Sequence, residues 1–351
     1  MKPQSATLLW ALLASTVASA QSRGSELSCV VAISPSDTEF GRLVAVAPGP
    51  QNRLAWTDGR SGQFAVRDAQ GKVRMVGRQG SGPGEFQYVA GMDWIGDSLW
   101  VADARLPRVQ VFSDTGRLLR GTTAVLPAGW GGGDENVLVG FGHMPLGYDL
   151  PFAVLSYTQG ATNIDTVAVF PVTPGERFPL PPAMGLNRQP LLPATIVGGS
   201  PNHQRFCGAV PVAEDRVQIR CVDRRGRVLL DRNVQLEPRP LSTEVYDAVV
   251  KAWSRVPGRT ESMLRDLIRR PRHLPVVLEM AVENEGGLWL RRTHESETPS
   301  LWARLGGDGT PRGVVSVPRG YRVLRVDAEG VWATSTDADG LQTAHRCSAG
   351  R

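Results

Sequence analysis

The sequence predicts an all-β fold of repeated four-stranded units, a β-propeller. Trp56 and Trp100 stand in the matching stretches LAWTD and LWVAD and lie 44 positions apart. Near the C-terminus, Trp289 and Trp332 return 43 positions apart. Both spacings fit one four-stranded propeller blade. The 39 glycines and 26 prolines suit many short strands joined by turns. We expect the repeated tryptophans to belong to the core.

The first 20 residues are expected to be a secretory signal peptide. A short apolar run over residues 8–13 follows a basic start, and the small residues Ala18 and Ala20 fit cleavage before Gln21. The apolar run is too short for a stable transmembrane helix. No other stretch is long and apolar enough to span a bilayer, so we expect a mature chain that is secreted or periplasmic.

Two blades are predicted over residues 42–76 and 89–119, each with an apolar inner strand, a tryptophan strand, a third strand and a turn. The glycine-rich residues 80–86 connect them. Polar side chains are needed to satisfy the backbone of such a connection. We therefore assign this structural role to Glu85 and to Asp93.

The middle of the chain is less regular. Residues 127–150 are rich in glycine, and we expect them to be irregular, with Gly129–Gly133 in a loop. Two strands follow before residue 170, and the prolines of residues 171–193 predict a long surface loop. Residues 195–230 predict another blade that ends in a turn and a final strand.

Residues 242–272 break the β pattern. Val245, Val249 and Trp253 fall at helical spacing after a Ser242 cap, and a second apolar set follows Thr260. We interpret this segment as a helical hairpin inserted between blades.

The C-terminal part predicts the last two blades. Residues 276–317 give a fifth, and residues 322–347 give most of a sixth, which an N-terminal strand near residues 30–33 would complete. Six blades of about 45 residues each and the helical insert account for the 331 residues after the leader. The predicted domain is thus a six-bladed β-propeller over residues 21–351 with a helical insert at 242–272.

The basic charge does not indicate nucleic acid. The formal net charge is +5 and the isoelectric point is about 9.3, yet lysine occurs only at positions 2, 72 and 251. The arginines are spread along the chain rather than gathered in one stretch, and an exported protein rarely meets nucleic acid. We expect no nucleic-acid partner, and we expect a monomer.

Four cysteines in an exported chain should be paired, and three pairings are possible. Cys207 and Cys221 flank a stretch with a turn, which favours a bond across a hairpin. Cys29 and Cys347 lie near the two mature ends, which a closed propeller brings together in one blade. The alternative is that one pair stays reduced or binds a metal, but no CxxC spacing supports a metal site.

One blade resembles the NHL repeat. The resemblance is carried by a glycine-rich lead with Glu-Phe, a Val-Ala-Asp strand, an Arg-Val-Gln-Val-Phe strand and a glycine turn. These stand at residues 80–86, 99–103, 108–112 and 116. The resemblance implies an exported propeller of the NHL kind, a fold that hosts lyases and also serves as a binding platform. It supports the fold more than any activity.

The resemblance also suggests a candidate site. In the NHL arrangement, the loops after the Val-Ala-Asp strands lie on one face of the ring. Such a set of arginines could bind a carboxylate, sulfate or phosphate. The candidate ligand-binding residues are Arg60, Arg105, Arg291, Arg292 and His294. The alternative is that Asp58 and Asp103 cap their own turns while the arginines pair locally.

No catalytic set converges in the sequence. The five histidines form no HxH or HxxxH pair, although His143 and His203 could meet over the channel. We expect no cofactor. The leading hypothesis is an exported binding or scaffold module for a small anionic ligand, a peptide or a protein. The alternative is a propeller lyase or hydrolase with a metal ion in the central channel.

Overall fold

The computed structural model describes most of the mature chain. The described residues are 25–37, 40–103, 105–106, 108–123, 129–133, 137–143, 152–158, 164–171, 191–294, 296–327 and 330–349. Between residues 122 and 164, the description covers the backbone only. No helix in this part of the chain is long and apolar enough to cross a membrane.

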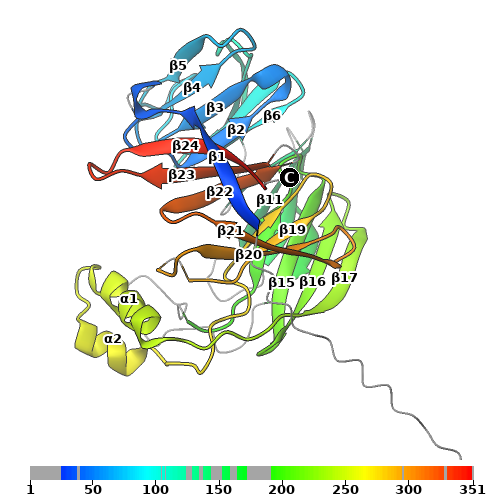
Figure 1. Ribbon diagram of the computed structural model, residues 1–351. Helices are drawn as coiled ribbons and strands as arrows, with labels where there is room; N and C mark the ends of the chain where they lie inside the picture. Colours follow the sequence, from blue (N-terminus) through cyan, green and yellow to red (C-terminus); the bar gives the residue numbers. More distant parts are fainter. Residues whose placement is uncertain are drawn as a thin grey trace, which may run out of the picture.

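Four antiparallel sheets of four strands each follow one another along the chain (Figure 1). The first is formed by β2 (Ala45–Pro48), β3 (Leu54–Thr57), β4 (Gln63–Arg67) and β5 (Val73–Gly77). The second is formed by β6 (Val89–Ile95), β7 (Ser98–Asp103), β8 (Arg108–Phe112) and β9 (Leu118–Thr123). The third is formed by β10 (Gly129–Gly133), β11 (Val137–His143), β12 (Phe152–Thr158) and β13 (Ile164–Phe170). The fourth is formed by β14 (Ile196–Gly199), β15 (Arg205–Ala213), β16 (Arg216–Asp223) and β17 (Val228–Gln235).

The remaining strands form one sheet of eight, in the order β18-β19-β20-β21-β1-β24-β23-β22. One half contains β18 (Glu279–Val282), β19 (Leu288–Arg291), β20 (Ser300–Leu305) and β21 (Pro311–Val317). The other half contains β22 (Tyr321–Asp327), β23 (Gly330–Thr336), β24 (Gln342–Ala349) and the N-terminal β1 (Ser25–Ile33). The strand β1 runs antiparallel to β24 and meets β21 in parallel only at Ser25 and Glu26.

Two disulfide bonds are present, and both are the pairs expected from the sequence. Cys29 and Cys347 face each other in the register of β1 and β24, with an S–S distance of 2.06 Å. Cys207 and Cys221 face each other in the register of β15 and β16, with an S–S distance of 2.05 Å. The first bond joins the two ends of the chain, and the second lies within one hairpin.

Two helices lie together at one corner of the molecule (Figure 1). They are α1 (Thr243–Ser254) and α2 (Glu261–Leu267). Elsewhere, short 3₁₀ turns occur at Pro35–Asp37 and Pro50–Asn52. The hydroxyl of Ser242 accepts a hydrogen bond from the Val245 N–H, and that of Thr260 accepts one from the Met263 N–H. These N-caps satisfy backbone donors that the first helical turn leaves unpaired. The apolar faces of the two helices pack in one cluster with Leu191.

The expectation of irregular structure over residues 127–150 was wrong for part of that range. Gly129–Gly133 forms β10 and Val137–His143 forms β11. Each of these strands pairs antiparallel with its neighbour in the sheet. Pairing with neighbouring strands therefore overrides the low strand propensity of glycine. The loop predicted over residues 171–193 lies largely outside the described residues.

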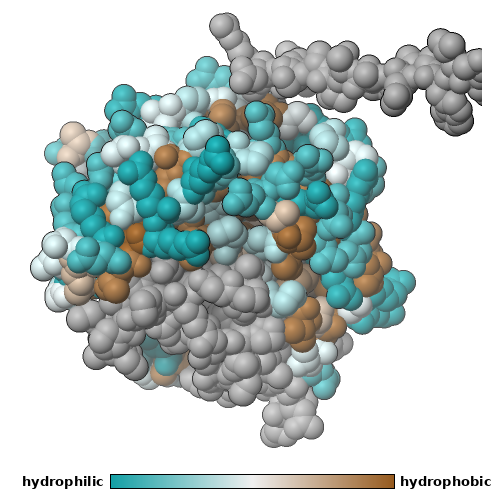
Figure 2. Space-filling view, turned by 90° about the horizontal axis from the view of Figure 1, so that it is seen from below, coloured by the Kyte–Doolittle hydropathy of each residue, from teal (hydrophilic) through white to brown (hydrophobic). Residues whose placement is uncertain are grey.

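The core lies where the faces of the sheets meet. Trp56, Trp100, Trp289 and Trp332 are all buried, which confirms that the repeated tryptophans belong to the core. Between the first two sheets, the rings of Phe64 and Phe112 meet edge to face at 5.1 Å. The molecule is hydrophilic over much of the described part of the face in Figure 2, with small hydrophobic patches between. The repeated sheets make a propeller-like fold.

Candidate functional site

A cavity of about 370 Å³ lies at the centre of the fold. Of the strands whose side chains the structure describes, five contribute to its lining, namely β2, β6, β14, β18 and β22, each the first of its run of four. Most of its lining residues are small or apolar, including Val46, Met92, Met280, Val282 and Leu324. Among the described residues, the polar and charged side chains that line it are those of Asp93, Ser200, His203 and Arg325. We call this space the channel cavity.

An ion pair joins two of the inner strands across the channel cavity. Asp93 lies in β6 and Arg325 in β22, and the Nη1 of Arg325 donates to both carboxylate oxygens of Asp93 at 3.1 Å. Asp93 is 6% exposed, and the Arg325 side chain is 16% exposed. The β22 register shifts between Val323 and Arg325, so the regular pairing with β23 is interrupted beside the arginine. The two groups are thus paired in a largely dehydrated place.

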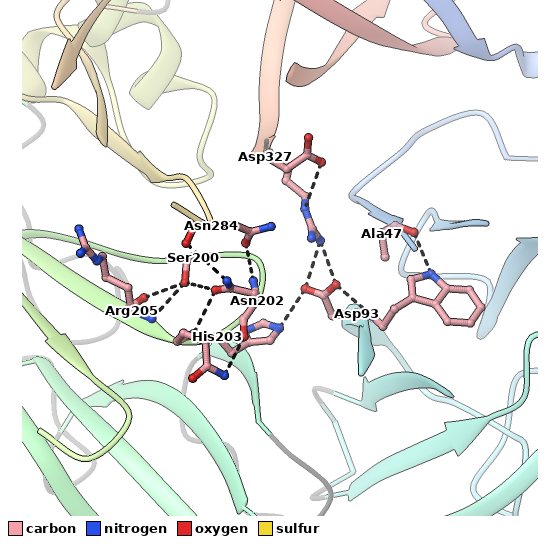
Figure 3. A network of polar contacts seen from close by, with 11 residues as sticks. Ala47, Asp93, Ser200, Asn202, His203, Arg205, Asn284 and Asp327 are labelled. Atoms are coloured by element: carbon pink, nitrogen blue, oxygen red, sulfur yellow. Dashed lines mark hydrogen bonds and ion pairs between the residues drawn. The ribbon is translucent and has the colours of Figure 1, made fainter. Parts of the chain in front are cut away.

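His203 is the third member of this network. Its Nε2 lies 3.0 Å from the Oδ2 of Asp93, and its side chain is also buried. Figure 3 shows His203 beside Asp93, with Asp327 above them and farther from Asp93. The Nε of Arg325 lies 4.0 Å from the Oδ2 of Asp327. We call Asp93, His203 and Arg325 the channel triad.

A tight turn between β14 and β15 positions His203. The residue has a φ of +56°, in the left-handed region that few residues other than glycine adopt. Its N–H donates to the carbonyl of Ser200 at 2.8 Å. The neighbouring Asn202 N–H donates to the side chain of Asn284 at 2.8 Å, which ties this turn to the turn after β18 (Figure 3). The imidazole is therefore held by its backbone as well as by Asp93.

The charge state of Asp93 follows from its surroundings. Burial alone raises the pKa of this carboxyl, but the positive charge of Arg325 and the hydrogen bond with His203 outweigh burial, so the pKa lies below its ordinary value. The group is therefore ionised at neutral pH and can only accept hydrogen bonds. The Nε2 of His203 must then carry the proton that it shares with Asp93.

Two of the residues predicted to bind an anion lie in turns of the first two sheets. Arg60 and Arg105 are exposed, in the connections β3–β4 and β7–β8. Beside them, Asp58 and Asp103 accept hydrogen bonds from backbone N–H groups of their own turns. The turn-capping role considered for these two aspartates is therefore confirmed.

Arg291, Arg292 and His294 lie together around the β19–β20 connection. Arg291 has its Nε 3.2 Å from the Oε2 of Glu279, and the Nη2 of Arg292 donates to the carbonyl of Glu237. Burial and the neighbouring charge of Arg239 lower the pKa of Arg292 to about 10. The Nδ1 of His294 lies 2.8 Å from the hydroxyl of Ser296.

None of the five predicted residues lines the channel cavity. Their connections join the second and third strands of a sheet, whereas the His203 turn joins a first strand to a second. Successive connections of an antiparallel sheet alternate between the two ends of its strands. The predicted residues therefore lie at the strand ends away from the His203 turn.

Arg325 was not among the predicted site residues, and Asp93 was expected to have a different role. The Oε2 of Glu85 does accept from the N–H of Gly82 at 2.7 Å, as expected for the glycine-rich connection. Asp93 instead belongs to the channel triad. The available signal was a charged residue inside an otherwise apolar inner strand, in GMDWI for Asp93 and VLRV for Arg325. His203 lines the channel cavity, whereas the side chain of His143 lies outside the described residues, so a meeting of the two over the channel stays a prediction.

Within the described ranges, no group of three or more histidine, cysteine, aspartate or glutamate side chains is arranged to hold a metal ion. The channel triad brings together one carboxylate, one imidazole and one guanidinium. Such a set can donate hydrogen bonds to a ligand and can also accept hydrogen bonds from it.

Comparison with known proteins shows similarity at the level of the fold. No protein-family model matches the chain, and no curated protein matches its sequence. A member of the DUF4221 family from Bacteroides vulgatus matches with a TM-score of 0.53 and 11% identity, over 93% of this chain and 98% of that one. A provisionally assigned exported protein from Bacteroides fragilis matches with a TM-score of 0.52 and 12% identity, over 93% and 95%. A gluconolactonase from Xanthomonas campestris is more distant, with a TM-score of 0.42 and 11% identity, over 91% and 94%.

Proposed function

We propose that this chain is an exported, NHL-like, six-bladed β-propeller that binds a small molecule in the channel cavity. The observation that carries the proposal is a cavity of about 370 Å³ lined by apolar side chains and by the channel triad. Small-molecule sites are typically concave and mostly apolar, with a few convergent polar groups. The channel cavity has these properties.

The count of six blades treats the eight-stranded sheet as two blades. Its halves are joined only by two residue pairs between β1 and β21, whereas β1 pairs with β24 along most of its length. The helices α1 and α2 follow β17 and precede β18, which is the place of an insert between two blades. A blade built from the first and last strands of the chain closes many propellers into a ring.

Export is supported by the leader-like residues 1–20 and by the two disulfides. Disulfides persist in oxidising compartments and are rare in the cytosol of most organisms. N-terminal sequencing of protein recovered from the periplasm or medium tests this part of the proposal, and a mature chain that begins at Gln21 is the expected result.

The channel cavity is preferred over the predicted anion site. Arg291 and Arg292 already contact Glu279 and the Glu237 carbonyl, so an anion would have to compete with these contacts. Anion binding by Arg60, Arg105, Arg291, Arg292 and His294 stays a prediction. It is separately testable by titration with sulfate and phosphate.

The binding test blocks the channel cavity. Ala90 lies in β6, is exposed and lines the cavity, so Ala90→Trp should occupy part of the space. Ala338 is exposed in the turn after β23, so Ala338→Trp is the matched control. A library of small molecules is screened by ligand-observed NMR against the mature protein. Binders that Ala90→Trp abolishes and Ala338→Trp leaves unchanged support the proposal, and binders that survive Ala90→Trp contradict it.

A further inference from the structure

We propose that the ligand of the channel cavity is an uncharged molecule that bears hydroxyl groups. The Nδ1 of His203 accepts a hydrogen bond from one ligand hydroxyl, and the Nη2 of Arg325 donates to a ligand oxygen. This inference rests on the proposed function, because it names the ligand class of the same site.

The first step is that Asp93 has little left to offer a ligand. Its Oδ1 accepts from the Trp94 N–H at 3.0 Å and from Arg325. Its Oδ2 accepts from Arg325 and His203. With both oxygens shared in this way, the carboxylate orients its two partners rather than binding the ligand itself.

The second step concerns His203. Its Nε2 carries the proton directed at Asp93, so in the neutral form of the ring the lone pair is on Nδ1. That nitrogen has no hydrogen-bond partner within the part of the chain that the structure describes. His203 is only 7% exposed, and it lines the cavity. The Nδ1 atom itself is not fully buried, so it is open to the cavity and can accept a hydrogen bond from a ligand that supplies an O–H.

The third step concerns Arg325. The hydrogen bonds to Asp93 both come from Nη1. Among the described residues, Nη2 donates no hydrogen bond; Arg325 lines the cavity, and its Nη2, unlike its Nε, is not a fully buried atom without a partner. The protons on Nη2 are therefore available to a ligand oxygen. Together, His203 and Arg325 present an acceptor and a donor, the combination that a hydroxyl-bearing molecule matches.

The charges in the cavity favour a neutral molecule. Asp93 pairs with Arg325, and the Asp327 carboxylate lies 4.0 Å from the same guanidinium. The positive charge of Arg325 is thus already offset by two carboxylates, so a ligand anion gains little net attraction. A ligand cation would have to enter next to the guanidinium. The apolar walls, with Met92 and Met280, can pack against the C–H groups of a polyol or a sugar.

The test compares three sets of probes of matched size: monosaccharides and polyols, their carboxylate counterparts, and their amine counterparts. Protein labelled with ¹⁵N in histidine is titrated with each set, and the ring signals of His203 are followed by NMR. We expect members of the uncharged set to bind saturably, to shift the His203 ring signals, and to lose at least tenfold in affinity in His203→Phe. The matched control is His345→Phe, since His345 is also buried, has one side-chain hydrogen bond to Ser335, and does not line the cavity.

The outcomes separate this inference from the proposed function. Carboxylates or amines that bind in the cavity more tightly than the uncharged set would refute the ligand class and leave channel binding intact. Uncharged binders that neither shift His203 nor weaken in His203→Phe would refute the assigned contacts. A failure of all three sets of probes to bind would refute the inference about the ligand class. It would count against small-molecule binding in the channel cavity only if the library screen also found no binder. If His203→Phe does not fold, the assigned contacts are judged from the His203 ring signals of the unmodified protein, which must shift when the uncharged probes bind.

Discussion

Replacement of Arg325 by methionine should destabilise the protein by leaving Asp93 without its cation. The carboxylate is 6% exposed and receives two contacts of 3.1 Å from the guanidinium. Methionine keeps the length of the side chain and removes the charge. Asp93 would keep its contacts with His203 and the Trp94 N–H, but no other cation contacts it among the described residues.

The size of the effect follows from the burial of the pair. Two unit charges about 4 Å apart attract by about 4 kcal/mol at an effective dielectric constant of about 20. Removal of one partner from a buried ion pair costs about 3–5 kcal/mol, because the other charge stays dehydrated. The contacts that Asp93 keeps place the expected loss near the lower end, at about 3 kcal/mol. This is a large part of the 5–15 kcal/mol that is typical of a folded protein.

Urea denaturation followed by circular dichroism at neutral pH measures this loss. The control is Arg322→Met, which removes an exposed arginine from the same strand and should change stability by no more than about 0.5 kcal/mol. In the double variant Asp93→Asn/Arg325→Met, the unpaired charge is gone, so the loss should be smaller than the sum of the two single losses. The expected coupling is about 2–3 kcal/mol.

The pH dependence supplies a second check. In the folded protein the pKa of Asp93 is lowered, so ionised Asp93 stabilises the fold. This contribution is fully present above the unfolded pKa of about 3.9, and it is lost as the pH falls through the lower pKa that Asp93 has in the folded protein. In Arg325→Met, protonation of Asp93 relieves the unpaired charge. The stability gap between the two proteins should therefore narrow as pH falls below about 4. A loss under about 1 kcal/mol at neutral pH, or a gap that widens in acid, would refute the interpretation of a buried, dehydrated pair.

Three further predictions concern the scaffold. Replacement of both Cys29 and Cys347 by alanine opens a loop with a sequence separation of 318 and should lower the free energy of unfolding by roughly 5–6 kcal/mol from loop entropy. The same change at Cys207 and Cys221, with a separation of 14, should lower it by about 3 kcal/mol. Urea denaturation measures both losses of stability. An equal loss for the two pairs would contradict the view that the Cys29–Cys347 bond stabilises the fold by closing the long loop. Gly208→Ala places a Cβ 2.3 Å from the Phe170 ring and should lower the stability by about 1–3 kcal/mol in thermal unfolding. The control is Gly121→Ala, where the nearest atom to the added Cβ is at 3.8 Å, and it should change the stability little. Ser242→Ala removes the N-cap of α1 and should cost about 1 kcal/mol in the same assay. The control is Ser254→Ala at the other end of the helix, where the side chain is half-buried and caps no N-terminus, and it should change stability little.

The fold was largely predictable because its signals are local. Strand, turn and tryptophan recur within about 45 residues, so one blade can be identified without knowledge of the others. The strands at Gly129–Gly133 and Val137–His143 were missed for the opposite reason. Glycine carries little strand propensity of its own, and the pairing of these segments depends on neighbours that a local pattern does not contain.

The candidate site was harder to predict because it is assembled over long distances in the sequence. Asp93 and Arg325 are 232 positions apart, and Asp93 and His203 are 110 apart. The arginines after the tryptophan strands were visible as a repeated pattern, whereas the charged residues of the inner strands form no pattern. An isolated charge in an apolar strand indicates burial, but it does not identify its partner.

The position of β1 has a consequence for the order of events during synthesis. This strand leaves the ribosome before the other described strands, and its main partner β24 leaves after all of them. Its few contacts with β21 also wait until most of the chain has been made. The first strand must therefore remain unpaired, with its exposed Val30 and Val31, while the intervening sheets form. A chain truncated near its C-terminus would lack the partner that β1 awaits, and its open edge would be available to pair with another molecule.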